Sequence, residues 1–79
     1  MEEISNLVKL FNKERKANKN DWVFFNYTIQ GEVVSVKSYN TWIQVLKIGD
    51  RIKDSGPMDC KVKDMEIYLK DILNRAFLK

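Results

Sequence analysis

The chain has 79 residues, of which 44% are hydrophobic and 32% are charged. A chain of this length forms one domain, and its composition is typical of a globular protein rather than a disordered one. The net charge is +3, but acidic and basic residues are interspersed, so the charge alone does not indicate a nucleic-acid partner. We therefore expect one folded domain over residues 1–79.

The cysteine content and the short apolar runs indicate a protein of a reducing, aqueous compartment. Cys60 is the only cysteine, so the chain cannot form an internal disulfide, as is typical of proteins in reducing compartments. The N-terminal residues are acidic and lead into an amphipathic segment, unlike a secretory signal. The longest apolar run, residues 22–25, is far shorter than the roughly 20 residues that span a bilayer. We expect a soluble cytoplasmic protein with no membrane partner.

A helix is predicted from about residue 2 to residue 17. Its apolar side chains recur at the spacing of one helical face; they are Ile4, Leu7, Val8 and Phe11. Acidic residues lie in its first turn and basic residues near its end, which suits the helix dipole. Asn18 and Asn20 are residues that commonly end a helix.

Strands are predicted where β-branched and aromatic residues gather, at about residues 22–30, 32–37 and 41–48, with a short further strand allowed at 51–53. Gly31 marks the first turn. Tyr39 and Asn40 are expected at the exposed tip of the second turn, and Gly49 begins the third. The result is an antiparallel meander.

The alternation within these strands assigns side chains to the two faces of the sheet. In the first strand Val23, Phe25, Tyr27 and Ile29 point one way, and Trp22 and Phe24 point the other way. In the third strand Ile43 and Val45 share one face, and Trp42, Leu46 and Ile48 share the other. Both faces of the sheet are therefore expected to be apolar.

A second helix is predicted over about residues 60–77, after a loop at residues 54–59 in which Asp59 is placed to cap it. Its apolar stripe consists of Val62, Met65, Leu69, Ile72, Leu73 and Ala76. Acidic residues precede basic ones by four positions in the pairs Glu66–Lys70 and Asp71–Arg75. The order α-β-β-β(-β)-α predicts an α+β fold with both helices on one face of the sheet.

The residue types argue against catalysis. The chain has no histidine, which is the commonest general base and metal ligand. Its three glycines, at positions 31, 49 and 56, form neither of the common phosphate-binding loops. Cys60 would lie at a helix start, where a thiolate is favoured, but without a base it is more typical of a small packing residue. We expect no enzyme, no cofactor, no small-molecule substrate and no metal site.

The aromatic residues are the strongest candidates for a binding surface. Two helices cover only one face of a sheet, so some large side chains are left for a partner, while others fill the core. The candidate residues for partner binding are Trp22, Phe24, Tyr39, Asn40 and Trp42. A protein partner is expected first, and a second copy of the chain, giving a homodimer, is one such partner. The alternative is a nucleic acid bound by basic residues near the end of the first helix, namely Lys13, Arg15, Lys16 and Lys19. A further alternative is a structural homodimer of unknown role.

The element order and length resemble those of a double-stranded-RNA-binding domain, and the resemblance covers most of the chain. That family has a Gly-Pro-x-His hairpin and a run of lysines and alanines at the start of its second helix. This chain has Gly56-Pro57-Met58-Asp59 followed by "CKVKDMEIYLKD", so the resemblance is one of element order.

The small size, the lack of catalytic motifs and the high content of Asn, Lys and Ile are similar to those of accessory proteins from phages and mobile elements. Anti-CRISPR and other anti-defence inhibitors belong to this class. They share no common motif, so no residue role is transferred to this chain. The resemblance implies a protein that binds and blocks a larger host protein complex, and that acts in the host cytoplasm if a phage encodes it.

Overall fold

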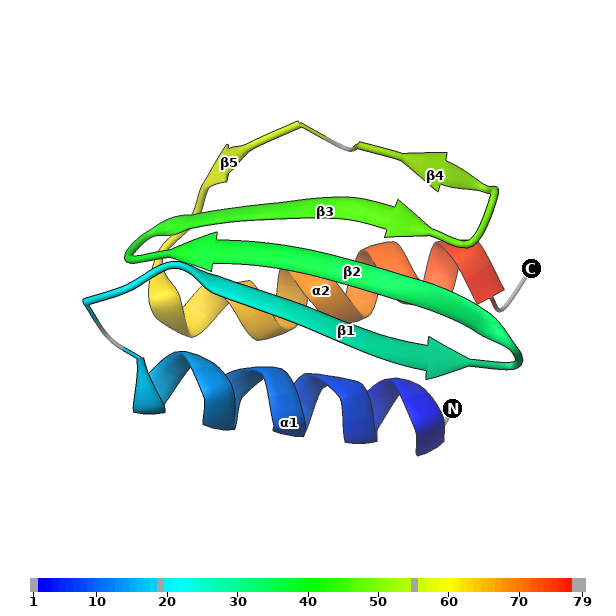
Figure 1. The fold of residues 1–79 in the computed structure, drawn as a ribbon, viewed down its shortest axis with the longest axis horizontal. Coiled ribbons are helices and arrows are strands. Elements are labelled where there is room, and N and C mark those ends of the chain that lie inside the picture. Colours follow the sequence, from blue (N-terminus) through cyan, green and yellow to red (C-terminus); the bar gives the residue numbers. More distant parts are fainter. Residues whose placement is uncertain (1, 19, 55, 78–79) are drawn as a thin grey trace.

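The computed structural model describes residues 2–18, 20–54 and 56–77. In chain order the elements are α1 (Glu2–Ala17), β1 (Val23–Ile29), β2 (Glu32–Tyr39), β3 (Trp42–Ile48), β4 (Ile52–Lys53), β5 (Met58–Asp59) and α2 (Val62–Phe77). The strands form one antiparallel sheet in which β1, β2, β3 and β4 are neighbours in that order and β5 also pairs with β3. Both helices lie against one face of this sheet (Figure 1), which confirms the predicted α+β fold.

The core fills the space between the helices and the sheet. Because the apolar stripe of each helix meets the inward positions of the strands, these side chains lose nearly all contact with solvent. The fully buried ones are Leu7, Val8 and Phe11 of α1, Met65, Leu69 and Leu73 of α2, and Ile29, Val34, Val36, Ile43, Val45 and Ile48 of the sheet. The predicted stripe of α1 is buried in full, whereas Val62 at the start of α2 is 40% exposed.

The turn between β2 and β3 differs from the prediction. Tyr39 is the last residue of β2 and pairs with Trp42, so only Asn40 and Thr41 form the tip. Asn40 has a φ of 53°, a left-handed conformation that asparagine adopts more readily than most residues. Ser38, expected beside an exposed tip, is buried on the helix side, and its hydroxyl donates a hydrogen bond of 2.9 Å to the Trp42 carbonyl.

A β-bulge in β3 overturns the predicted face of Ile48, whereas Ile43 and Val45 share the core face and Trp42 lies on the other face, as predicted. Ser35 pairs with Lys47 and Val36 pairs with Val45, which leaves Leu46 as an extra residue without a partner in β2. An extra residue reverses the alternation beyond it. Ile48 therefore points into the core and is fully buried, and it does not share a face with Trp42 as predicted.

The segment before α2 is also more ordered than the predicted loop. Met58 and Asp59 form β5 and pair with Ile43 and Trp42, so Asp59 does not cap the helix. The Cys60 amide donates a hydrogen bond of 2.7 Å to the Thr41 carbonyl. As a result α2 begins at Val62, two residues later than predicted, and Cys60 lies outside it.

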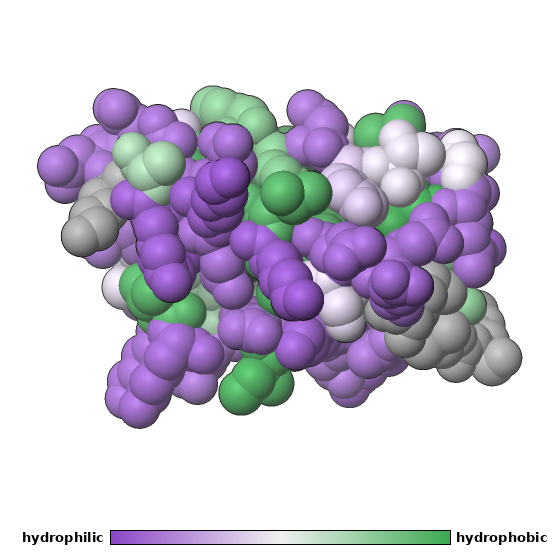
Figure 2. Space-filling view, turned by 90° about the horizontal axis from the view of Figure 1, so that it is seen from below, coloured by the Kyte–Doolittle hydropathy of each residue, from purple (hydrophilic) through white to green (hydrophobic). Residues whose placement is uncertain are grey.

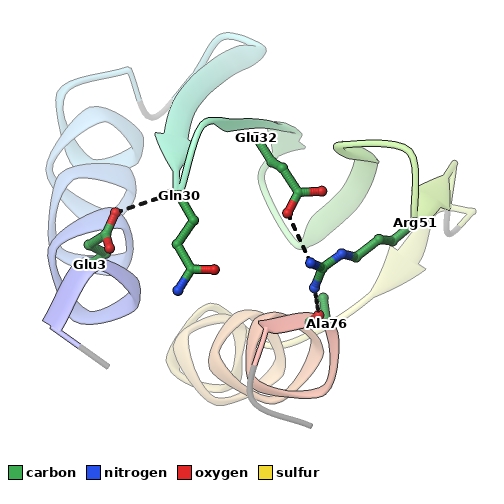
Figure 3. Close-up of polar contacts among 5 residues, drawn as sticks. All are labelled: Glu3, Gln30, Glu32, Arg51 and Ala76. Carbon is green, nitrogen blue, oxygen red and sulfur yellow. Dashed lines mark hydrogen bonds and ion pairs between the residues drawn. The ribbon is translucent and has the colours of Figure 1, made fainter.

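Polar contacts hold together the end of the domain where both the β1–β2 and β3–β4 turns lie (Figure 3). Arg51 donates a hydrogen bond to the Ala76 carbonyl and forms an ion pair of 3.1 Å with Glu32. A cation at the last carbonyls of a helix is favourable because it meets the negative end of the helix dipole. The Gln30 backbone N–H donates a hydrogen bond of 3.3 Å to the Glu3 carboxylate. These contacts have a structural role and lie at the end opposite to the β2–β3 turn.

The two ion pairs predicted along α2 are present. Lys70 lies 3.0 Å from Glu66, and Arg75 lies 3.1 Å from Asp71. Each of the four side chains is at least 45% exposed, so each pair contributes little to the free energy of unfolding.

Candidate functional site

Four large aromatic side chains lie together on the sheet face that the helices leave uncovered. Trp22 immediately precedes β1, Phe24 belongs to β1, Tyr39 ends β2 and Trp42 begins β3. Their exposed fractions are 49% for Trp22, 67% for Phe24, 37% for Tyr39 and 45% for Trp42. We call these four residues the aromatic cluster.

Strand pairing brings the cluster together at the end of the sheet near the β2–β3 turn. Tyr39 lies opposite Trp42, and Val23 lies opposite Ser38, which places Trp22 beside Tyr39. The Trp22 and Tyr39 rings are 5.0 Å apart between centroids and tilted by 32°, a spacing at which aromatic pairs attract. Asn40 follows Tyr39 at the tip, so the structure brings all five predicted partner-binding residues to one end of the domain.

Lys37 lies within the cluster, and the sequence interpretation did not include it. Its ammonium nitrogen is 4.6 Å from the centre of the Trp22 ring and 5.9 Å from that of Phe24, so it forms cation–π contacts with both. The alternation of β2 places Lys37 on the same face as Tyr39. The two-residue spacing between them is visible in the sequence and could have predicted this. The cluster therefore combines apolar rings with one positive charge.

The remainder of the uncovered face is mixed, because it carries polar pairs as well as Val33, which is 41% exposed at the other end of β2. The expectation that both faces are apolar is therefore met only in part. The Ser35 hydroxyl donates a hydrogen bond of 2.6 Å to Asn26, and the Gln44 amide donates one to Asp54. The Gln44 amide, the Gly56 backbone amide and the Lys37 charge together lower the pKa of Asp54. The four large exposed aromatic side chains of this face are those of the aromatic cluster.

A pocket of about 340 Å³ lies next to the aromatic cluster, between the end of α1, the start of β1, the β2–β3 turn and the start of α2. Its lining includes Arg15, Asn18, Asp21, Tyr39 and Asn40. Because Tyr39 also belongs to the cluster, the pocket and the cluster adjoin each other.

Arg15 occupies an unexpected position in α1. It follows Phe11 by four residues and so continues the buried stripe of the helix beyond the core. Its side chain is half-buried, and its Nε is a buried atom with no hydrogen-bond acceptor among the described residues. The four-residue spacing from Phe11 is the sequence signal that distinguishes Arg15 from the exposed lysines of the same helix.

The other basic residues proposed for nucleic-acid contact do not share a surface with Arg15. Lys13 and Lys16 are exposed, and at 100° per residue they point well away from the Arg15 direction. Lys19 lies outside the described residues. The side of the molecule that carries α1 is mostly hydrophilic, with small separate hydrophobic areas (Figure 2).

Cys60 is a free thiol outside the aromatic cluster. Burial, together with the nearby Asp64 and Asp59 carboxylates, raises the pKa of the Cys60 thiol, which disfavours the reactive thiolate. No group of three or more side chains that could hold a metal ion is present in residues 2–18, 20–54 and 56–77. Within those residues, no helix is both long enough and apolar enough to span a membrane.

Comparisons with known proteins provide no relative for this chain. No protein-family model matches it, and neither a curated protein nor a solved structure shows significant similarity. The functional argument therefore rests on the geometry of the aromatic cluster and the adjoining pocket.

Proposed function

We propose that this chain is a non-catalytic protein-binding module whose contact surface is the aromatic cluster with Asn40. In biological terms it would be a small inhibitor of the anti-CRISPR or anti-defence kind, encoded by a phage or mobile element, that binds and blocks a host protein complex. The observation that carries the binding role is the placement of four exposed aromatic side chains at one end of the uncovered sheet face.

Physical chemistry supports this interpretation of the cluster. Exposed aromatic rings gathered in one place gain free energy when a partner excludes water from them. Trp and Tyr are enriched among the residues that dominate protein–protein binding energies, because they bury a large area with few rotatable bonds. The inhibitor role rests on the resemblance of size and composition described above.

A homodimer is the alternative protein complex. Its contact surface would be the same in both copies, so each copy would contribute its own Lys37 charge to that surface. These like charges count against self-association and favour a different protein as the partner. Sedimentation velocity separates the two alternatives, because a homodimer forms with the purified chain alone.

The nucleic-acid alternative depends on the exposed lysines of α1. It requires a mobility shift whose affinity falls steeply with salt, because Lys contacts to phosphate release counterions. The separation of Lys13 and Lys16 from the aromatic cluster means that this alternative leaves the cluster without a role.

Affinity capture from cells that carry the gene tests the proposal. We expect the tagged wild-type chain to retain a specific protein partner and the double variant Phe24→Ser/Trp42→Ser to lose at least nine-tenths of it. Ile67→Ser is the matched control, because Phe24 and Ile67 are both 67% exposed but Ile67 lies on α2. Equal retention by wild type and double variant, at equal protein levels, contradicts the proposal.

A further inference from the structure

Three rings of the aromatic cluster form one row across the sheet. Trp42 lies directly opposite Tyr39 in the pairing of β2 with β3, and Trp22 lies beside Tyr39 on the β1 side. Neighbouring strands are about 4.8 Å apart, so the backbone at Trp22 and the backbone at Trp42 are separated by roughly 10 Å across the sheet. We call Trp22, Tyr39 and Trp42 the aromatic row.

The polar atoms of the aromatic row are mainly hydrogen-bond donors. Trp22 and Trp42 each carry an indole N–H, which only donates, and Tyr39 carries a hydroxyl that can donate. Both tryptophans are exposed, and neither indole N–H donates to another residue within the ranges 2–18, 20–54 and 56–77. The row is therefore complementary to a partner that is rich in acceptors.

The charges beside the aromatic row cancel. The Lys37 ammonium lies 4.6 Å from the centre of the Trp22 ring, and Asp59 lies opposite Trp42 in the pairing of β3 with β5. A nucleic-acid backbone or a strongly acidic surface is attracted by a net positive charge. The row is better matched by an uncharged partner.

A proline-rich segment in the polyproline II conformation has this chemistry. Proline has no backbone N–H, so such a segment presents carbonyl acceptors with few donors and without charge. One turn has three residues and spans roughly 9 Å, which is close to the width of the aromatic row. The conformation exists before binding, so little entropy is lost, and surfaces lined by aromatic rings are a recurrent site for such segments.

We infer that the aromatic row binds a proline-rich segment of the partner, which crosses β1, β2 and β3 in the polyproline II conformation. This inference rests on the proposed function and specifies the chemistry of the partner. Two prolines three residues apart pack against Trp22 and Trp42. The carbonyl groups between them accept hydrogen bonds from the Tyr39 hydroxyl and the indole N–H groups.

Nuclear magnetic resonance of the purified chain tests the ligand class, because both tryptophans of the chain lie in the aromatic row. The probe is acetyl-hexaproline amide, which is uncharged and adopts polyproline II before binding. Its control is an acetylated and amidated peptide of alternating glycine and serine with the same length, which is uncharged and flexible. We expect hexaproline to shift both indole N–H signals saturably, and the control peptide to cause less than a fifth of that shift.

Two variants of Tyr39 separate the ring from its hydroxyl. Tyr39→Phe keeps the ring and should weaken hexaproline binding by about fivefold, because one hydrogen bond is lost. Tyr39→Ser removes the ring and should abolish the saturable shift. The control Ile67→Ser changes an exposed residue of α2 and should leave the affinity unchanged.

Three results would overturn the inference. The first is an equal shift with both peptides, or no shift with hexaproline. The second is unchanged hexaproline binding by both Tyr39 variants. The third is tighter binding of the oligonucleotide (dT)10 at the same indole signals, which would favour a nucleic acid as the ligand.

The outcome is separable from that of the proposed function. Capture that depends on Phe24 and Trp42 but persists in excess hexaproline would overturn the proline-rich segment and leave the protein-binding function standing. Saturable hexaproline binding without any captured protein would support the ligand class of the aromatic row and count against the proposed function.

Discussion

Replacing Ile48 by serine is expected to lower the free energy of unfolding by about 3 kcal/mol or more, whereas Leu46→Ser is expected to lower it by about 1 kcal/mol. Ile48 is fully buried. The change to serine therefore leaves a cavity and buries a hydroxyl group among apolar side chains, which offer it no hydrogen-bond partner. Leu46 is the half-buried extra residue of the bulge, and its side chain stays near solvent. Urea unfolding of both variants measures the difference.

The two substitutions test the bulge directly, because they make the same chemical change to residues of similar size. A domain of this length has a total stability of roughly 4 to 12 kcal/mol, so Ile48→Ser could leave it partly unfolded at room temperature. If β3 had an unbroken alternation, Leu46 and Ile48 would share a face and would show similar losses. Similar losses would therefore contradict the observed register.

Trp42→Ala is expected to weaken binding to the captured partner by about 30-fold, which corresponds to about 2 kcal/mol. The same change should alter the free energy of unfolding by no more than about 1 kcal/mol, because 45% of the side chain is exposed. A binding titration of the Trp42→Ala variant measures the change in affinity, and a urea unfolding curve of the same variant measures the change in the free energy of unfolding.

Ile67→Ala is the control for that titration, since it also removes an exposed apolar side chain. We expect less than a threefold change in its affinity, because Ile67 lies on α2, away from the aromatic cluster. If Trp42→Ala lowered stability as much as it lowered affinity, Trp42 would be a structural residue and the cluster would not be the contact surface.

The helices and the first strand could be predicted from the sequence because their periodicity is local. The spacing of Ile4, Leu7 and Phe11 is sufficient for α1, and the alternation from Val23 to Ile29 is sufficient for β1. In each case the side chains that the pattern assigns inward are buried or half-buried in the fold.

The features that could not be predicted depend on pairing between distant segments. The sequence of β3 contains no signal for a bulge at Leu46, which arises from its register with β2. Met58 and Asp59 become a strand only because β3 has a free edge beside them, and the residues themselves resemble a loop. Both the bulge in β3 and the strand β5 thus depend on pairing with residues distant in the sequence.

The candidate site was predictable in part. Alternation along β1 and the position of the second turn were enough to place Trp22, Phe24, Tyr39 and Trp42 as candidates. Lys37 was overlooked although the alternation of β2 includes it. The pocket could not be predicted, because it forms where α1, the β2–β3 turn and α2 meet in space.

Site-specific photocrosslinking in cells that carry the gene tests the central claim most directly. A benzophenone-bearing phenylalanine replaces Phe24 in one variant and Ile67 in another, and these two positions are equally exposed, at 67% each. We expect a covalent adduct with a specific protein from position 24 and little or none from position 67. Adducts of equal yield from both positions, adducts from position 67 alone, or no adduct from position 24 would contradict the claim that the aromatic cluster is the contact surface.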